Sequence, residues 1–139
     1  MYKELELLLR RLCFNVKVEG RKVLKDFDIT PSQFDILQKL FFMGEMRLTD
    51  LSDMLGITKG TASGIVKRLV DYGYVEKVKS QIDRRVYNLS ITNEGKKVIE
   101  EVINRRIEYI KRVFSSFDEK TQKAFLDHLR EITKVIEKS

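Results

Sequence analysis

The residues of this 139-residue chain that are best suited to chemistry are basic, and they are concentrated between positions 58 and 91. That stretch has seven Lys and Arg against three Asp and Glu, so it carries +4 of the chain's net charge of +6. A local concentration of positive charge is typical of a surface that binds a polyanion. A solvated, slightly basic face without a partner would have the same composition, so charge alone does not decide between the two.

Residues 49–72 are the part of the chain that would position these charges, because their pattern is that of a helix-turn-helix motif. Thr49 and Thr58 are suited to cap its two helices. Ser52 supplies the small side chain needed where the helices cross, and Gly56 occupies a turn whose positive φ favours glycine. An ordinary corner between two helices is the alternative. The apolar residues expected to face inward are Leu51, Leu55, Ile57, Ala62, Ile65 and Leu69.

The second helix of this motif leaves two lysines, one serine and two glycines on its outer face. A glycine inside a helix costs about 1 kcal/mol relative to alanine, so Gly60 and Gly64 need a reason. One reason is that the backbone lies flush against a flat surface such as the floor of a DNA major groove. Ser63, Lys59 and Lys67 favour that explanation, because they share the same face and suit a phosphate-lined groove. Close approach of another helix is the alternative.

Residues 73–91 change from helical to extended character, with β-forming residues on both sides of the polar stretch 80–85. We therefore expect a two-stranded hairpin with a basic tip. An arginine at such a tip is suited to a narrow minor groove, where the negative potential is enhanced. An ion pair between Arg85 and Asp83 at the tip, worth about 0–1 kcal/mol, is the alternative.

Longer helices are expected around this unit. Thr30, Pro31 and Gln33 form a capping box with proline at the first helical position. Thr92 and Asp118 are suited to cap the last two helices. Apolar residues spaced mainly by three or four positions mark three helical stripes, and these predict a seam shared with a second copy of the chain. The stripes are Leu5, Leu9, Leu12, Val16, Val23 and Phe27; Ile99, Ile103, Ile107, Ile110, Phe114 and Phe117; and Phe125, Leu129, Ile132 and Ile136.

Four segments carry a resemblance to a known family: Leu51-x-x-x-Leu55-Gly56, Gly73-Tyr74-Val75, Asp83-Arg84-Arg85 and Leu89-Ser90-Ile91-Thr92-x-x-Gly95. With them the chain resembles the MarR/SlyA family of bacterial and archaeal regulators from end to end. The resemblance implies a mostly α-helical fold with a small β-wing, as a single MarR-type domain over 1–139. In it, a winged helix-turn-helix DNA-binding lobe (29–91, with the motif at 49–72 and the wing at 73–91) is flanked by N- and C-terminal dimerisation helices (1–28 and 92–139).

The same resemblance implies a function. Family members are two-fold homodimers that bind double-stranded DNA, with a recognition helix in the major groove and a wing in the minor groove. They are usually repressors relieved by a small-molecule effector or by oxidation. We therefore expect a palindromic operator whose half-sites lie about 10 bp apart. By the same resemblance Arg85 reaches into the minor groove, Asp83 orients it, and Arg84 contacts the DNA backbone.

Two groups of site residues follow from the motif and the resemblance. The residues expected to contact DNA are Thr58, Lys59, Gly60, Ser63, Gly64, Lys67, Arg68, Asp83, Arg84 and Arg85. The residues expected to form the dimer seam are Leu5, Leu9, Leu12, Ile103, Ile107, Phe125, Leu129 and Ile132.

Two other classes of function fit the sequence less well. An enzyme would need convergent acid–base groups, whereas the single histidine, His128, has only Asp127 beside it. The spacing Gly56-x-x-x-Gly60 lacks the Gly-Lys-Ser/Thr ending of a phosphate-binding loop, and no metal-ligand spacing is present. We therefore expect no catalytic residue, metal or cofactor. A winged helix that binds only protein is the remaining alternative, but it would not need the concentrated positive charge.

The one cysteine, Cys13, excludes an intramolecular disulfide. Leu12-Cys13-Phe14 is similar to the sensing element of the hydroperoxide-responsive branch of the family, where nearby tyrosines activate the thiol. This chain has no tyrosine between positions 3 and 71, and a small, buried, hydrophobic cysteine is the alternative. The longest apolar run, 40–43, is far too short to span a membrane, and no secretory signal is evident. We expect a cytoplasmic protein.

Overall fold

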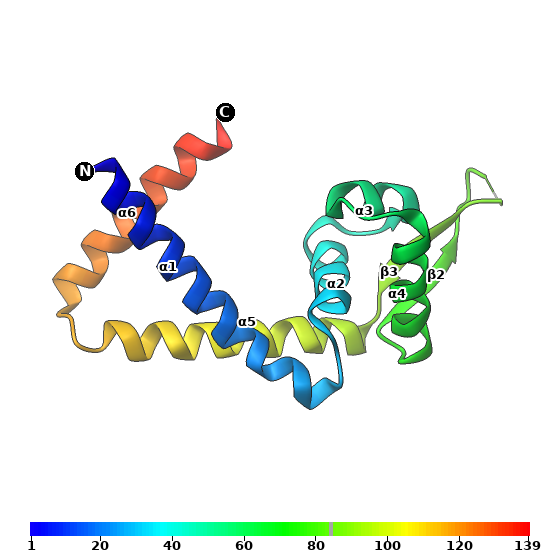
Figure 1. The fold of residues 1–139 in the computed structure, drawn as a ribbon, viewed down its shortest axis with the longest axis horizontal. Helices are drawn as coiled ribbons and strands as arrows, with labels where there is room; N and C mark the ends of the chain where they lie inside the picture. The colour runs from blue at the N-terminus through cyan, green and yellow to red at the C-terminus, as the bar shows by residue number, and fades with distance from the viewer. Residues whose placement is uncertain (84) are drawn as a thin grey trace.

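The computed structural model describes residues 1–83 and 85–139 and shows an elongated molecule with a lobe at one end (Figure 1). The long helix α5 (Asn93–Phe114) runs along the molecule from the lobe to the opposite end. Helices α1 (Tyr2–Arg21) and α6 (Glu119–Glu137) lie toward that opposite end. The fold is therefore mostly helical with a small β-wing, as expected.

The lobe contains the short helices α2 (Pro31–Met43), α3 (Leu48–Leu55) and α4 (Lys59–Asp71). The predicted capping box starts α2, because the Gln33 N–H donates to Thr30 Oγ1 (3.2 Å) and the Thr30 N–H donates to Gln33 Oε1 (3.0 Å). Thr92 and Asp118 cap α5 and α6 in the predicted way. These local signals fix where the helices begin.

Three strands form the sheet of the lobe: β1 (Met46–Arg47), β2 (Val75–Lys79) and β3 (Tyr87–Ile91). Their order is β1-β3-β2 and both pairings are antiparallel. The expected two-stranded hairpin is thus β2 and β3, and β1 adds a third strand to its base. A two-residue strand is too short to show alternation, so its pairing with β3 is set by the tertiary fold and was not evident from sequence.

The hydrophobic core fills the lobe and continues onto the first half of α5. Its fully buried members come from α2, α3, α4 and α5, and Val75 and Leu89 cover it from the sheet. The largest buried side chains are Phe34, Ile36, Leu37, Leu40, Leu51, Leu69 and Ile99. The lobe is therefore a packed unit that holds α4 in place.

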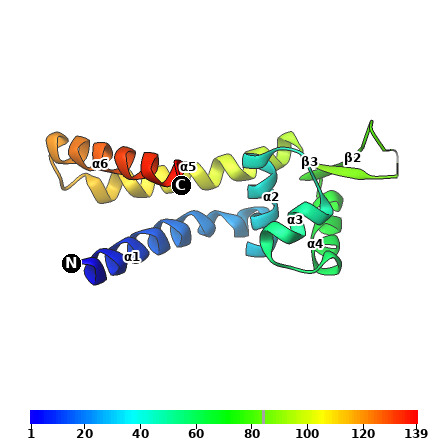
Figure 2. The ribbon, with the colours of Figure 1, turned by 90° about the horizontal axis from the view of Figure 1, so that it is seen from above.

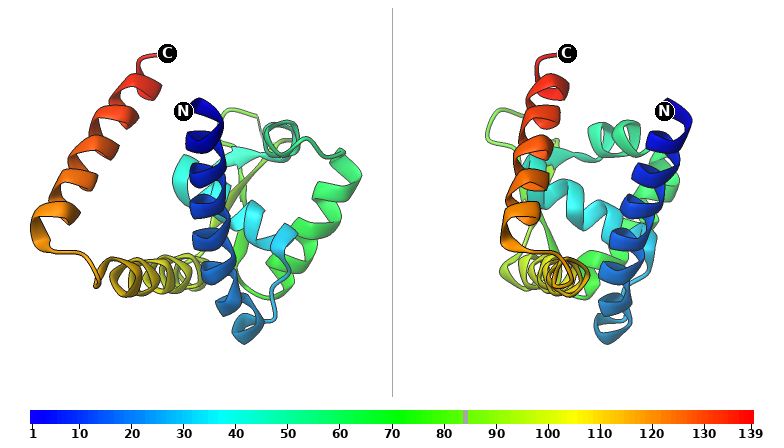
Figure 3. Two further views of the ribbon diagram at one scale, coloured as in Figure 1. Left: turned by 60° about the vertical axis from the view of Figure 1, so that its left-hand side comes forward. Right: turned by 90° about the vertical axis from the view of Figure 1, so that its left-hand side faces the viewer.

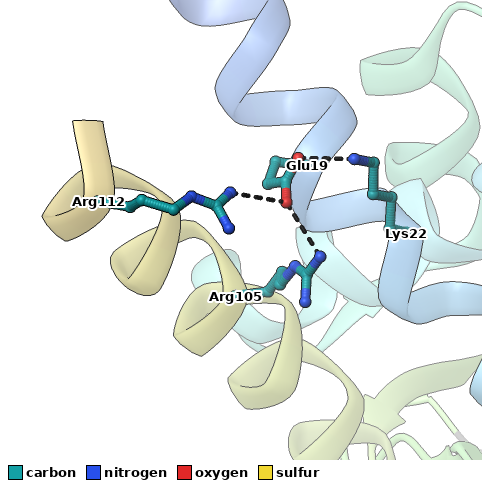
Figure 4. Close-up of polar contacts among 4 residues, drawn as sticks. All are labelled: Glu19, Lys22, Arg105 and Arg112. Carbon is teal, nitrogen blue, oxygen red and sulfur yellow. Dashed lines mark hydrogen bonds and ion pairs between the residues drawn. The ribbon is translucent and has the colours of Figure 1, made fainter.

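Helix α1 crosses α5 and is joined to it by charge as well as by packing. Glu19 is buried, and its carboxylate accepts hydrogen bonds from Lys22 Nζ (2.8 Å) and, across the helix pair, from Arg112 (3.4 Å) (Figure 4). It also forms an ion pair with Arg105 of α5 (3.0 Å). Gly20 allows the close approach, because a Cβ there would lie 2.7 Å from Arg106 Nε. These contacts fix the crossing point.

The N-terminal stripe was expected to be one helix over 2–27, but the structure divides it. After α1 the chain tightens into the 3-10 helix η1 (Lys22–Phe27), which ends at Asp28 with φ 55°. Apolar spacing is compatible with either kind of helix, so periodicity could not detect the change. The tighter turn redirects the chain from α1 into α2.

The far end of the molecule leaves apolar side chains uncovered. No residue of α6 is buried, and Leu5 (51%), Ile107 (43%) and Ile132 (52%) are largely exposed. Viewed from above and from the end, α1 and α6 stand apart (Figures 2 and 3). Among the described residues, no helix is long and apolar enough to cross a membrane.

Candidate nucleic-acid interface

Helices α3 and α4 form the predicted helix-turn-helix corner. Gly56 has φ +66°, the left-handed conformation that favours glycine, and the Ile57 N–H donates to the Ser52 carbonyl (3.0 Å). Ser52 is buried at the crossing, as expected for a small residue there. Thr58 caps α4, because its Oγ1 accepts a hydrogen bond from the Thr61 N–H (3.1 Å).

Two details of the motif differ from expectation. Helix α3 begins at Leu48 with Arg47 in the N-cap position, so Thr49 is not its cap; the Thr49 carbonyl instead accepts a hydrogen bond from Ser52 Oγ (2.8 Å). On α4, Val66 is buried with Ala62 and Leu69, whereas Ile65 is only half-buried. Ile65 lies at the edge of the inward face, and spacing alone did not separate the centre of that face from its edge.

The outward face of α4 has the residues that the sequence placed there. Thr58, at its N-terminus, is exposed with all the others, which are Lys59, Gly60, Ser63, Gly64, Lys67 and Arg68. This face combines positive charge with an almost bare backbone. A flat, negatively charged surface could therefore approach it closely.

The two glycines of α4 are not required by packing within the chain. A Cβ at Gly64 would have nothing within 4 Å, and one at Gly60 would have only Thr58 Oγ1 at 4.0 Å, among the described residues. Within the described part of the chain, no other helix therefore approaches these glycines. The space over both glycines is open.

The C-terminal end of α4 is held against the start of α5. Gly73 has φ +81°, the left-handed conformation that favours glycine after a helix, and the Tyr74 N–H donates to the Leu69 carbonyl (2.9 Å). Thr92 Oγ1 donates to the Gly73 carbonyl (2.6 Å) while capping α5. Gly95 packs so closely on this turn that a Cβ would overlap the Tyr74 carbonyl oxygen. The outward face of α4 is thus oriented by the long helix.

The wing projects from the lobe beyond the helices (Figure 1). Near its tip, Asp83 Oδ1 accepts hydrogen bonds from the Arg85 N–H (3.0 Å) and from Arg85 Nε (3.3 Å). These two bonds, the backbone one first, hold the pKa of Asp83 below its ordinary value. The Arg85 side chain remains 91% exposed. The ion pair considered as the alternative therefore exists, and it leaves the guanidinium accessible. Arg84 lies outside the described residues.

A groove of about 650 Å³ between α4 and the wing contains a cation that the sequence analysis missed. Its lining includes Ser63 and Lys67 from α4, Arg85 from the wing, Lys77 from β2 and Arg47 from β1. Arg47 also contributes to lowering the pKa of Asp83 by its charge. It lies outside the basic stretch 58–91, so only the pairing of β1 with β3 could reveal that it belongs to this surface.

Cys13 and His128 lie away from this surface. Cys13 is exposed on α1 of the single chain, and His128 is exposed on α6. Among the described residues, no group of three or more His, Cys, Asp or Glu could hold a metal ion.

Three separate comparisons with known proteins point to one family. A family model described as the MarR family matches residues 29–87. The uncharacterized HTH-type transcriptional regulator YsmB of Bacillus subtilis (strain 168) is 36% identical over 114 residues, which are 82% of this chain and 78% of that protein.

Two solved structures match nearly the whole chain. Transcriptional regulator Tm0710 from Thermotoga maritima is 48% identical, with a TM-score of 0.92 over 98% of this chain and 96% of that one. A MarR family protein from Bacillus stearothermophilus is 31% identical, with a TM-score of 0.81 over 98% and 95% of the two chains. The corner, the basic outward face, the wing and these matches lead to one conclusion. The chain belongs to the MarR family of winged helix-turn-helix, DNA-binding transcriptional regulators.

Proposed function

We propose that this DNA-binding regulator acts in the cytoplasm as a homodimer on an inverted-repeat operator, and that it is a repressor released by a small-molecule effector. The observation that carries the proposal is the exposed face of α4, where cations flank two glycines that no packing requires. The groove with Arg47 and Lys77 continues this face toward the wing. A winged helix that binds only protein is the second candidate.

In this proposal the recognition helix α4 enters the major groove. Ser63 and Lys67 meet base edges or the adjacent phosphates, and Thr58 and Lys59 anchor phosphates at the helix N-terminus. Gly60 and Gly64 allow the approach, Arg68 adds charge, and Arg85 enters the minor groove with Asp83 orienting it. Arg84 is assigned a phosphate contact on the resemblance alone.

The proposed dimer would cover the apolar surface at the far end of the molecule. An open groove of about 520 Å³ lies between α1, the end of α5 and α6, and its lining is mainly apolar. Burial of side chains such as Phe125, Leu129 and Ile107 would give roughly 1.5–3 kcal/mol each. Leu5, Leu9, Leu12 and Ile132 complete the proposed seam. Ile103, which the sequence also placed there, is partly buried against the core of its own chain. Sedimentation at micromolar concentration should give twice the chain mass, and a 16.4 kDa species alone would contradict the dimer.

The proposed effector site is a groove of about 620 Å³ between α1, α2 and α5. Arg21 and Arg106 line it, and the Nε of each is buried without a hydrogen-bond partner among the described residues. Burial, and then the neighbouring charge of Arg21, lower the pKa of Arg106. Leu9, Leu12 and Val16 supply an apolar wall. Arg21 also donates a hydrogen bond to Asp35 (2.9 Å), which lines the same groove, so Arg106 is the cation left for a ligand. A small apolar molecule with a carboxylate would suit this guanidinium and the apolar wall.

Benzoate and its neutral analogue benzamide test the effector site. Benzoate should raise the melting temperature of the wild type and release its DNA, benzamide should do neither, and Arg106→Met should abolish the response to benzoate. Equal responses to the two compounds, or a response that survives Arg106→Met, would contradict the site.

The experiment that tests the proposed function is selection of bound fragments from genomic DNA, followed by affinity measurement on the selected duplex and on random duplex. An inverted repeat with half-sites about 10 bp apart is expected, with affinity that falls steeply with salt. Lys67→Ala should weaken operator binding by about 1–3 kcal/mol if Lys67 reads a base. Failure of the wild type to bind any duplex would favour the protein-binding module.

A further inference from the structure

An isoleucine near the tip of the wing is almost fully exposed. Ile82 is 97% exposed, a larger fraction than any other large hydrophobic residue among those described. It lies in the loop between β2 and β3, which projects furthest from the lobe (Figure 1). Single exposed hydrophobic residues are common, so exposure alone assigns nothing to Ile82. The hydrogen bonds of the loop and the residues beside Ile82 point to a role for this side chain.

The loop does not need the Ile82 side chain for its shape. Its hydrogen bonds are polar and local: Ser80 Oγ accepts from the N–H groups of Ile82 and Asp83 (both 3.3 Å), the Ser80 N–H donates to the Val86 carbonyl (3.0 Å), and the Val86 N–H donates to the Asp83 carbonyl (3.0 Å). The Ile82 backbone is therefore held by its neighbours while the side chain packs on almost nothing. A β-branched side chain is also stiff at χ1, so little conformational freedom is lost when it makes a contact.

The neighbours of Ile82 indicate what that contact would be. Asp83 follows it directly and pairs with Arg85, the guanidinium that the proposed function places in the minor groove. Both Ile82 and Arg85 are exposed at the same tip, and the groove with Lys67 and Arg47 continues from Arg85 toward α4. The minor groove has walls of deoxyribose C–H groups, which offer apolar surface to a side chain such as Ile. Proteins that bind this groove often bring apolar side chains into it, most often as wedges between base steps.

We infer that Ile82 is an apolar minor-groove contact, which packs on the deoxyribose walls beside Arg85 and adds affinity that does not depend on charge. This inference rests on the proposed function, because it places the wing on DNA. It assigns the two exposed residues of the tip different tasks. Arg85 supplies attraction that salt screens, and Ile82 supplies burial of apolar surface that salt leaves unchanged.

The test uses the full-length chain and the selected operator, with affinity measured by fluorescence anisotropy over a series of salt concentrations. Ile82→Ser should bind the operator about tenfold more weakly, with an unchanged slope of log affinity against log salt. Ile82→Leu should retain most of the affinity, because it keeps the apolar surface. Gln81→Ser is the matched control, since Gln81 is an exposed, uncharged residue of the same loop, and it should bind like the wild type.

The outcomes separate this inference from the proposed function. Wild-type affinity in Ile82→Ser, an equal loss in Ile82→Leu, or an equal loss in Gln81→Ser would overturn the role of Ile82 while leaving DNA binding intact. A changed salt slope in Ile82→Ser would also overturn it, because the loss would then come from displaced charges. Failure of the wild type to bind DNA would contradict the proposed function itself. Near-ultraviolet and far-ultraviolet circular dichroism of each variant verifies the fold.

Discussion

Single residues of α4, the proposed recognition helix, should combine a cost to stability with a benefit to DNA binding. Gly64 weakens α4 as a helix, yet the structure has open space where its side chain would be. Gly64→Ala should therefore stabilise the folded chain by up to about 1 kcal/mol, because alanine is the better helix former and meets no clash. It should also weaken operator binding about tenfold, because the methyl group would separate the backbone from the groove floor. Urea unfolding and anisotropy measure the two effects. Tighter or unchanged DNA binding would contradict the close approach of α4.

Substitution of Asp83 tests whether this residue orients Arg85 for DNA binding. Removing its negative charge should strengthen binding to random duplex by roughly twofold to threefold, because repulsion of phosphate is lost. Operator binding should fall at the same time, because Asp83 holds the Arg85 backbone and side chain through two hydrogen bonds. Affinities of Asp83→Ala for operator and random duplex, measured in the same salt, check this. A rise in both would leave Asp83 as a turn residue only.

Elements with a local signal could be predicted from the sequence, and elements that depend on distant partners could not. The capping box at Thr30, the left-handed turns at Gly56 and Gly73 and the caps at Thr58 and Thr92 each depend on a few neighbouring residues. The sequence favours a short extended segment at 45–48, but its pairing with β3 could not be predicted, and for this reason Arg47 was missed as part of the candidate site. The change from α1 to η1 was missed because the two kinds of helix share similar apolar spacing.

At the junction of α4, β3 and α5, a change of glycine to alanine should lower stability, whereas at Gly64 it should raise it. Gly95 also lies in a helix, but the space that a Cβ would need is occupied. A Cβ at Gly95 would overlap the Tyr74 carbonyl oxygen and would lie 2.7 Å from Ile91 Cγ1. Gly95→Ala should destabilise the chain by about 1–3 kcal/mol, because overpacking against backbone exceeds the gain in helix propensity. The same urea unfolding that serves Gly64→Ala measures it. A Gly95→Ala variant as stable as the wild type would contradict this prediction, because it would show that α5 can move away from Tyr74 without loss of stability.

At the scale of the whole molecule, two kinds of surface lie at opposite ends of α5. The lobe presents charge and bare backbone, and the far end presents the uncovered apolar faces of α1, α5 and α6. Apolar periodicity indicated those faces, but it said nothing of how α1 is placed across α5. That placement depends on Glu19 meeting Arg105 and Arg112, which are more than 80 residues further along the chain. No local pattern links residues so far apart.

The Glu19 cluster makes the placement of α1 sensitive to pH. The hydrogen bond from Lys22, followed by the charges of Lys22 and Arg105, lowers the pKa of Glu19 in the folded chain. A carboxyl whose folded pKa is lowered adds stability that is fully present above its unfolded pKa, about 4.3, and is lost as the pH falls through the folded pKa. Glu19→Gln should therefore melt at a lower temperature than the wild type at pH 7, and the difference should shrink as the pH falls below about 4.3. Melting curves at one protein concentration measure this.

Glu6→Gln is the matched control for this prediction, because Glu6 also lies on α1 but is exposed, and among the described residues its one ion pair is with Arg10 of its own helix. An exposed ion pair of this kind contributes little to stability, so the melting temperature of Glu6→Gln should stay close to that of the wild type at pH 7 and at pH 3. A difference between Glu19→Gln and the wild type that is equally large at pH 7 and pH 3 would mean that Glu19 acts through its shape and hydrogen bonding. The ionised carboxylate would then have no special part in joining α1 to α5.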